Sequence, residues 1–191
     1  MTTEPLRSDP LSAIGPGRLV AVAGPSGAGK DTLIRIALAK VPEAIVQSRV
    51  VTRPSSAAEN NEEMTPAAFD AARAAGDFAL DWEAHGLKYG LRRTLDDHIV
   101  AGRTVVVNVS RRVVPHLRQR YANVVAVLVT APDEILMARL TGRNRSSDGA
   151  LDQRLQRAAP EGDMKADVTI NNIGEPDEMA ALLVNAIRGA R

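Results

Sequence analysis

The chain has 191 residues, of which 45% are hydrophobic and 25% are charged, and this composition predicts one soluble globular domain. The formal net charge of +1 gives no general reason to expect a nucleic acid or a membrane as partner, and we expect neither. The absence of cysteine excludes disulfides, zinc-thiolate sites and thiol nucleophiles.

Strands and helices are expected to alternate along most of the chain. Residues 1–17 are expected to form a flexible lead into a single domain over 18–191. Apolar runs predict strands over 18–23, 44–51, 104–109, 123–130 and 167–172. Helical spacing predicts helices over 31–40, 66–75, 94–101, 111–121, 133–140, 151–158 and 176–188. This order predicts an α/β fold with helices on both faces of a parallel sheet.

Two smaller inserts are expected to interrupt this core, at about 52–90 and 142–158. The polar stretch 52–63 is expected to be a surface loop. Short strands around a turn at Gly86 are expected to follow within 77–90. The lone tryptophan, Trp82, lies in this stretch and is interpreted as a packing residue.

The stretch GPSGAGKDT, residues 24–32, resembles the phosphate-loop pattern G-x-x-x-x-G-K-[ST]. It follows an expected strand and precedes an expected helix, which is the context the pattern requires. Glycines let backbone N–H groups approach phosphate oxygens, and the helix N-terminus adds positive potential. The alternative is a glycine-rich turn without function. The expected ATP-binding residues are Gly24, Pro25, Ser26, Gly27, Ala28, Gly29, Lys30, Asp31 and Thr32, with Lys30 also catalytic.

Asp31 departs from the pattern, because Ser or Thr belongs at this position and Thr32 comes one place late. A bare carboxylate beside a triphosphate would repel it unless Mg²⁺ lay between them. The strand 104–109 ends near Asn108 and Ser110 and carries no acid that could hold the metal. Asp31 and Thr32 are therefore candidate Mg²⁺ ligands. The alternative is that Asp31 only stabilises the helix dipole.

Motifs along the chain resemble the guanylate kinase superfamily, over roughly residues 18–188. They are GPSGAGK, TRP at 52–54, DWEAHGLKYG at 81–90, RLTGR at 139–143, QRLQRA at 153–158 and INN at 170–172. The resemblance implies a P-loop kinase core with an acceptor-binding insert and an arginine-bearing lid. It implies lid positions, and so catalytic roles, for Arg139, Arg143 and Arg154. It also places Asn171 near the adenine.

The acceptor side departs from a true guanylate kinase. Arg49 and Leu91 stand where that enzyme has serines, and they cannot read a guanine edge. The chain is similar here to the ribose 1,5-bisphosphate phosphokinase family, which shares GKD in the loop, R-x-x-TR after strand two and N-x-SR after the central strand. A second arginine suits an acceptor that has two phosphates and no base. The implied substrate-binding residues are Arg49, Arg53, Asp81, Tyr89, Asn108 and Arg111.

This resemblance implies a cytoplasmic kinase that uses ATP and Mg²⁺. Its acceptor would be a small phosphorylated sugar, ribose 1,5-bisphosphate, and its product 5-phosphoribosyl 1-diphosphate, made during phosphonate breakdown. Two alternatives stay open: a guanylate or other nucleoside-monophosphate kinase, and an inactive interaction module of the same fold. An intact Lys30 loop disfavours the second alternative. The oligomeric state is left open.

Overall fold

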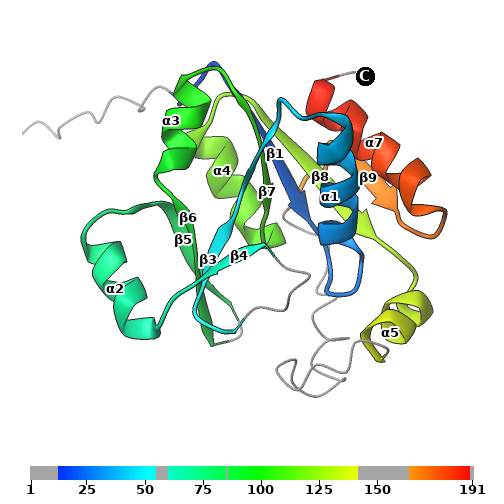
Figure 1. Ribbon diagram of the computed structural model, residues 1–191, viewed down its shortest axis with the longest axis horizontal. Coiled ribbons are helices and arrows are strands. Elements are labelled where there is room, and N and C mark those ends of the chain that lie inside the picture. The colour runs from blue at the N-terminus through cyan, green and yellow to red at the C-terminus, as the bar shows by residue number, and fades with distance from the viewer. Residues whose placement is uncertain (1–12, 55–59, 85, 142–163, 190–191) are drawn as a thin grey trace, which may run out of the picture.

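The computed structural model describes residues 13–54, 60–84, 86–141 and 164–189. Within them, five parallel strands form a central sheet in the order β2-β7-β1-β8-β9 (Figure 1). The strands are β1 (Arg18–Ala23), β2 (Ile45–Gln47), β7 (Thr104–Asn108), β8 (Val124–Thr130) and β9 (Val168–Asn171). The predicted α/β fold with a parallel sheet is therefore confirmed. Among the described residues, no helix is long and apolar enough to cross a membrane.

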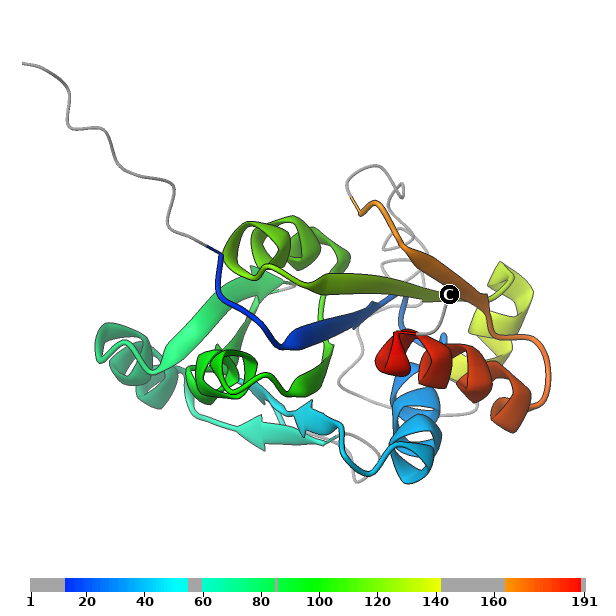
Figure 2. The same cartoon turned by 90° about the horizontal axis from the view of Figure 1, so that it is seen from above.

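Helices cover both faces of this sheet (Figure 2). One face carries α1 (Lys30–Lys40) and α7 (Pro176–Arg188), and the other carries α3 (Thr94–Val100) and α4 (Val114–Arg120). Strand β1 runs through the middle, and its fully buried side chains alternate between two cores. Val20 and Val22 pack with α1 and α7, whereas Leu19, Ala21 and Ala23 pack with α3 and α4. Strand β1 is thus buried on both faces as far as Ala23, and the loop that follows begins at the edge of the core.

A second sheet forms the insert, in the order β4-β3-β6-β5 within the described residues. Its strands are β3 (Arg49–Val51), β4 (Asn61–Glu63), β5 (Phe78–Ala84) and β6 (Leu87–Arg92), and α2 (Pro66–Ala74) follows β4. The prediction of one strand over 44–51 is wrong, because the chain changes sheets at Ser48. Before it, β2 pairs with β7, and after it, β3 pairs antiparallel with β6. The loop expected over 52–63 is also partly wrong, since β4 pairs with β3.

The helix expected over 111–121 begins as a 3-10 turn, η1 (Arg111–Val113), and continues as α4. Pro115 lies in the first turn of α4, where its missing N–H leaves no bond unmade. Helix α5 (Asp133–Thr141) follows β8 and begins next to Pro132, as expected. The turn at η1 places the residues after β7 beside the insert.

A partly buried polar cluster ties α3 to the end of α4. The hydroxyl of Tyr121 donates a 2.7 Å hydrogen bond to Oδ1 of Asp96. The guanidinium of Arg120 binds the same carboxylate through Nε, at 3.2 Å, and through Nη2, at 2.5 Å. Burial, reinforced by the bond to Asp96, raises the pKa of Tyr121 far above its ordinary value. The phenol is thus held protonated in the folded chain.

Alkaline conditions are expected to destabilise the fold through Tyr121. The raised pKa means that the contribution of this phenol to the unfolding free energy is complete below about pH 10, its unfolded pKa. That contribution is lost as the pH rises further. Chemical denaturation at pH 8 and above pH 10 should show a larger fall in unfolding free energy for the wild type than for Tyr121→Phe. An equal fall in both would contradict the prediction.

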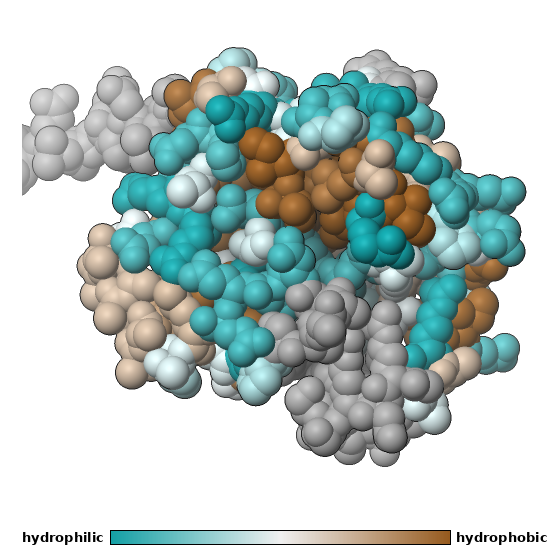
Figure 3. All heavy atoms as spheres, viewed as in Figure 1, coloured by the Kyte–Doolittle hydropathy of each residue, from teal (hydrophilic) through white to brown (hydrophobic). Residues whose placement is uncertain are grey.

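Apolar side chains gather between α3 and α1 on the face shown in Figure 3. The edge strand β2 leaves Val46 38% exposed, and Val100 at the end of α3 is 61% exposed. Hydrophilic residues surround this apolar patch on the same face. The candidate site lies instead at the carboxyl ends of the core strands, where ligands bind in open α/β sheets.

Candidate active site

The phosphate-loop motif forms a tight turn between β1 and α1. Gly24, Gly27 and Gly29 have positive φ values of 147°, 84° and 89°, which residues with side chains rarely adopt. A Cβ at Gly24 would stand 1.9 Å from the carbonyl oxygen of Val129 on β8. A Cβ at Gly29 would stand 2.4 Å from Nδ2 of Asn172. Glycine therefore lets the loop backbone lie close to two neighbouring strands at the start of α1.

Lys30 is the first residue of α1 and folds back over the loop. Its Nζ donates hydrogen bonds to the carbonyl oxygens of Gly24 and Pro25, each at 2.8 Å. These carbonyls carry only partial charge, whereas a phosphate oxygen carries a full one and forms a stronger bond to an ammonium group. The lysine is thus placed to exchange the carbonyls for nucleotide phosphates.

Asn172 supports the loop from the side of β9, and sequence analysis did not identify it. It is 6% exposed, and its Nδ2 donates a 2.8 Å hydrogen bond to the carbonyl oxygen of Ala28. The predicted residue, Asn171, is exposed at the end of β9. Strand alternation could have found the difference, because Ile170 is buried in the core and its second neighbour returns to the same side.

Arg139 reaches the same place from α5. Its Nη2 donates a 3.0 Å hydrogen bond to the backbone carbonyl of Asn172. Its Nη1 lies 3.9 Å from where a Cβ of Gly29 would stand. This nitrogen is buried and has no hydrogen-bond partner among the described residues. The guanidinium thus holds an unused donor beside the loop, consistent with the expected contact to the triphosphate.

The predicted lid, 142–158, lies outside the described residues, and so do Arg143 and Arg154. Their assignment as catalytic residues stays a prediction. Arg139, the third arginine of that set, is the one that the described structure places at the loop. The lid would follow directly from α5, which carries this residue.

Asp31 and Asn108 lie together, although sequence analysis gave them different partners. Nδ2 of Asn108 donates a 2.7 Å hydrogen bond to Oδ1 of Asp31. Asn108 is the last residue of β7 and is paired in register with Val22 of β1. Asp31 is in the first turn of α1, where the helix dipole also favours a carboxylate. The position of Asp31 therefore suits both a metal ligand and a residue that stabilises the helix dipole.

The oxygens around Asp31 fit a magnesium ion. Asp31 and Thr32 are both half-buried in the first turn of α1 and offer a carboxylate and a hydroxyl, oxygen ligands of the kind Mg²⁺ prefers. Within the described residues, no group of three His, Cys, Asp or Glu side chains could hold a metal. The donor set therefore suits an ion held by one or two protein oxygens together with phosphate oxygens.

The insert brings together two predicted acceptor residues, Arg49 and Tyr89. The rings of Tyr89 on β6 and Trp82 on β5 stack with centroids 5.5 Å apart. The guanidinium carbon of Arg49 lies 5.7 Å from the centroid of the Tyr89 ring. Nε of Arg49 also donates a 3.3 Å hydrogen bond to Oδ1 of Asn61 on β4. Stacking on an aromatic face and a bond at Nε hold the guanidinium in one direction.

Asp81 is ion-paired within the insert. Its Oδ1 lies 2.7 Å from Nε of Arg73 on α2, and Glu83 lies 3.5 Å from Nη2 of the same side chain. That Nε makes no hydrogen bond within the described residues, so the contact with Asp81 is a charge pair without hydrogen-bond alignment. Arg53 follows β3 in a bend and donates a 2.8 Å hydrogen bond to the carbonyl of Pro54. Acceptor contacts of Asp81 and Arg53 stay predictions.

The segment after β7 connects the loop to the insert. Asn108, at its start, contacts Asp31. Ser110 accepts a 3.2 Å hydrogen bond from the indole Nε1 of Trp82, a contact that the packing interpretation missed. Arg111 comes next, half-buried at the start of η1. The phosphate loop and the insert therefore both contact residues 108–111.

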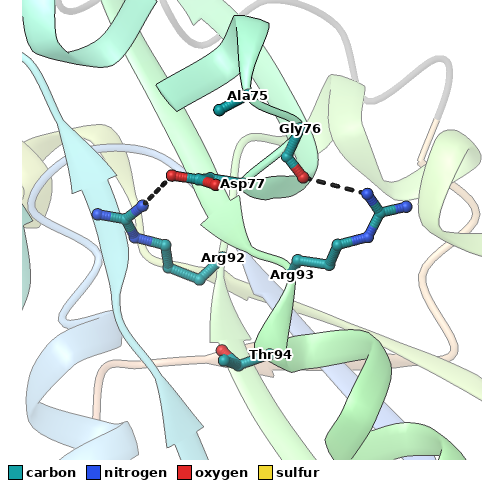
Figure 4. Close-up of a pocket in the computed structure, with 6 residues that line it drawn as sticks. All are labelled: Ala75, Gly76, Asp77, Arg92, Arg93 and Thr94. Atoms are coloured by element: carbon teal, nitrogen blue, oxygen red, sulfur yellow. Dashed lines mark hydrogen bonds and ion pairs between the residues drawn. The ribbon is translucent and has the colours of Figure 1, made fainter. Parts of the chain in front are cut away.

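A hollow of about 590 Å³ lies elsewhere, where α2 ends and α3 begins (Figure 4). Its lining residues are Ala75, Gly76, Asp77, Arg92, Arg93 and Thr94. Arg92 lies 3.5 Å from Asp77 and pairs with Glu62, whose hydrogen bond raises the pKa of Arg92 further. Arg93 donates a 3.1 Å hydrogen bond to the carbonyl of Gly76. Both cations are thus paired within the protein, and no predicted site residue lines the hollow.

Known proteins resemble the chain in sequence and in fold. No family model matches it. It is 52% identical to ribose 1,5-bisphosphate phosphokinase PhnN of Rhodopseudomonas palustris, over 100% of this chain and 98% of the relative. It is 52% identical to the protein of the same name from Bradyrhizobium diazoefficiens, over 92% of this chain and 90% of that one.

A crystal structure of guanylate kinase from Anaplasma phagocytophilum superposes with a TM-score of 0.67. It is 20% identical and covers 91% of this chain and 85% of its own. This likeness confirms the fold predicted from the sequence motifs. The identity to the two PhnN proteins, over nearly the whole chain, confirms the closer resemblance. The chain belongs to the ribose 1,5-bisphosphate phosphokinase family.

Proposed function

We propose that this chain transfers the γ-phosphoryl group of ATP to the 1-phosphate of ribose 1,5-bisphosphate. The bond between the γ-phosphorus and the β–γ bridging oxygen breaks, and an oxygen of the 1-phosphate forms the new bond. The products are ADP and 5-phosphoribosyl 1-diphosphate. The reaction would take place in the cytoplasm, where ATP is present, as a step of phosphonate breakdown. The names and full-length identity of the curated relatives support this assignment.

One observation carries the proposal at the level of the site. Residues 108–111 contact the phosphate loop through Asp31 and the insert through Trp82. Trp82 stacks on Tyr89, over which Arg49 lies. A donor phosphate held at the loop and an acceptor phosphate held at Arg49 would thus meet across one short, rigid segment. Holding both reactants in one geometry supplies much of the rate enhancement in phosphoryl transfer.

On the donor side, the loop backbone and Lys30 would bind the phosphates of ATP. Lys30 would move from the carbonyls of Gly24 and Pro25 onto phosphate oxygens and follow the charge during transfer. Asp31 and Thr32 would hold Mg²⁺, which when bound neutralises phosphate charge. Arg139 would contribute its unused Nη1.

On the acceptor side, Arg49 and Tyr89 would bind a phosphate of the sugar, and Arg53 and Arg111 would supply further positive charge. The attacking oxygen belongs to a phosphate that is already ionised at neutral pH, so no general base is required. The guanidinium groups would instead offset the repulsion between acceptor and donor phosphates. Asp81 would have a weaker part, because Arg73 already balances its charge.

A side-by-side coupled assay tests the proposal. ADP release is measured with ribose 1,5-bisphosphate, with GMP and without an acceptor, at equal ATP and Mg²⁺ concentrations. We expect turnover with the sugar bisphosphate and little with GMP. Efficient phosphorylation of GMP together with inactivity towards the sugar would overturn the acceptor assignment. Inactivity with both acceptors, in a chain that remains folded, would favour an interaction module.

Replacing Arg49 by Ser is expected to impair use of ribose 1,5-bisphosphate and to leave the KM for ATP nearly unchanged. A charge-assisted bond to phosphate contributes roughly 1.5–3 kcal/mol. Its loss should lower kcat/KM for the sugar by about ten- to a hundred-fold. The matched control is Arg35→Ser, which removes an exposed arginine of α1 and should have no effect. Equal kinetics for Arg49→Ser and the control would exclude Arg49 from the acceptor site.

A further inference from the structure

Within the described part of the chain, the side-chain amide of Asn108 is bonded through its nitrogen but not through its oxygen. Its Nδ2 donates a 2.7 Å hydrogen bond to Oδ1 of Asp31, while its own Oδ1 is buried without a hydrogen-bond partner among the described residues. The amide cannot be turned round, because its oxygen would then face the carboxylate of Asp31 at the same short distance. The electrostatics of the pair therefore fix the direction of the amide.

Stability alone does not explain an asparagine here. A buried oxygen without a hydrogen bond costs about 1–3 kcal/mol, and an apolar residue would avoid that cost at the end of a core strand. The preceding residues of β7, Val105, Val106 and Val107, are fully buried and apolar. Unsatisfied groups that persist in native proteins often mark functional sites. The amide thus has a role that a fourth valine could not fill.

The contact is held rigidly at both ends. Asn108 is paired with Val22, and the N–H of Val109 donates a 3.0 Å hydrogen bond to the carbonyl of Val22. Asp31 is in the first turn of α1, directly after Lys30. A hydrogen bond between two fixed elements selects one orientation of the carboxylate. Oδ1 of Asp31 is bound to the amide, and Oδ2 is thereby given a fixed direction.

We infer that Asn108 is a positioning residue for Asp31, rather than an acceptor-binding residue as its sequence motif implies. The strand supplies an amide, and the helix supplies the carboxylate that the amide orients toward the magnesium ion of the nucleotide. The inference rests on the proposed use of Mg²⁺ and ATP, but not on the identity of the acceptor. It extends the donor side of the site to the end of β7.

A double-mutant cycle tests it with Mn²⁺ as a spectroscopic substitute for Mg²⁺. The dissociation constant for Mn²⁺ is measured by electron paramagnetic resonance with a non-hydrolysable ATP analogue bound and no acceptor present. Asn108→Ala should weaken Mn²⁺ binding by about ten-fold or more, the usual effect of losing a ligand's outer-shell partner. Asp31→Asn, which removes the charge of the ligand itself, should weaken it at least as much. The double variant should bind no more weakly than Asp31→Asn, because Asn108 acts through Asp31.

The controls separate this role from the alternatives. Asn123→Ala removes an amide that donates to the carbonyl of Pro16, and it should leave Mn²⁺ binding unchanged. Asn108→Ser should reproduce Asn108→Ala and serves if the alanine variant does not fold. Unchanged Mn²⁺ binding in the Asn108 variants would overturn the inference. A lower melting temperature alone would then indicate a structural role for Asn108, and a higher KM for ribose 1,5-bisphosphate would indicate an acceptor-binding role. A wild-type chain that binds no Mn²⁺ with the analogue would overturn the proposed function as well.

Discussion

Replacing Lys30 by Met is expected to lower kcat by roughly 10²- to 10³-fold, or about 2.7–4 kcal/mol of transition-state stabilisation. The structure holds the ammonium of Lys30 against the loop backbone, at 2.8 Å from two of its carbonyls. Methionine keeps the length of the side chain and removes the charge that would follow the transferred phosphoryl group. The kcat is measured by ADP release at saturating ATP and acceptor.

The matched control for Lys30 lies at the other end of the same helix. Lys40 forms an exposed ion pair with Asp177, at 2.7 Å, and Lys40→Met should leave kcat unchanged. Both variants should melt at similar temperatures, since neither lysine is part of the buried core. A kcat for Lys30→Met within three-fold of the wild type would exclude the lysine from the chemical step.

Of the substitutions proposed for this chain, Gly24→Ala should cause the largest fall in the free energy of unfolding. The added Cβ would stand 1.9 Å from the carbonyl oxygen of Val129, and the residue would keep a φ of +147°. Backbone strain and overpacking each cost about 1–3 kcal/mol, so we expect the unfolding free energy to fall by about 4 kcal/mol. Urea denaturation followed by circular dichroism measures this fall. ATP binding should be lost with it, because the backbone between two strands must move.

Gly86→Ala is the control for this second prediction. Gly86 also has a positive φ, +73°, but, its chain neighbours aside, no atom of the described residues lies within 4 Å of the place where its Cβ would stand. This substitution should therefore cost only the conformational strain, about 1–2 kcal/mol. If both variants lost the same amount of stability, the contact with Val129 would not be what requires glycine at residue 24.

The core could be predicted from the sequence because its signals are local. The buried run 18–23, the glycine loop and the helix after it each carry their own pattern, and the structure places them as expected. The strand expected over 44–51 failed for a physical reason. Its apolar residues flank the polar residues 47–49, a pattern that one continuous strand could also show. Only pairing partners distant in sequence, β7 and β6, divide the stretch between two sheets.

The sequence predicted which residues belong to the candidate site better than it predicted which of them contact one another. Asp31 and Asn108 were both identified, but their hydrogen bond joins positions 77 residues apart and leaves no mark in a local pattern. The same is true of Asp81, whose charge is balanced by Arg73 on a packed helix. The support that Asn172 gives to the loop depends on which of two adjacent asparagines faces inward at the end of β9.

The change of sheets at Ser48 has a consequence for how acceptor preference could evolve. The insert strands lie between Ser48 and Arg93. Ser48 alone separates β2 of the core from β3 of the insert, and Arg93 alone separates β6 of the insert from α3 of the core. Everything between these two crossing points can be exchanged without changing the connectivity of β1, the loop or α1. A transplanted segment 49–92 from another kinase of this fold would lie beside the same residues 108–111, which contact Asp31. Under the proposed function, acceptor choice and phosphate transfer would therefore be separable parts of one chain.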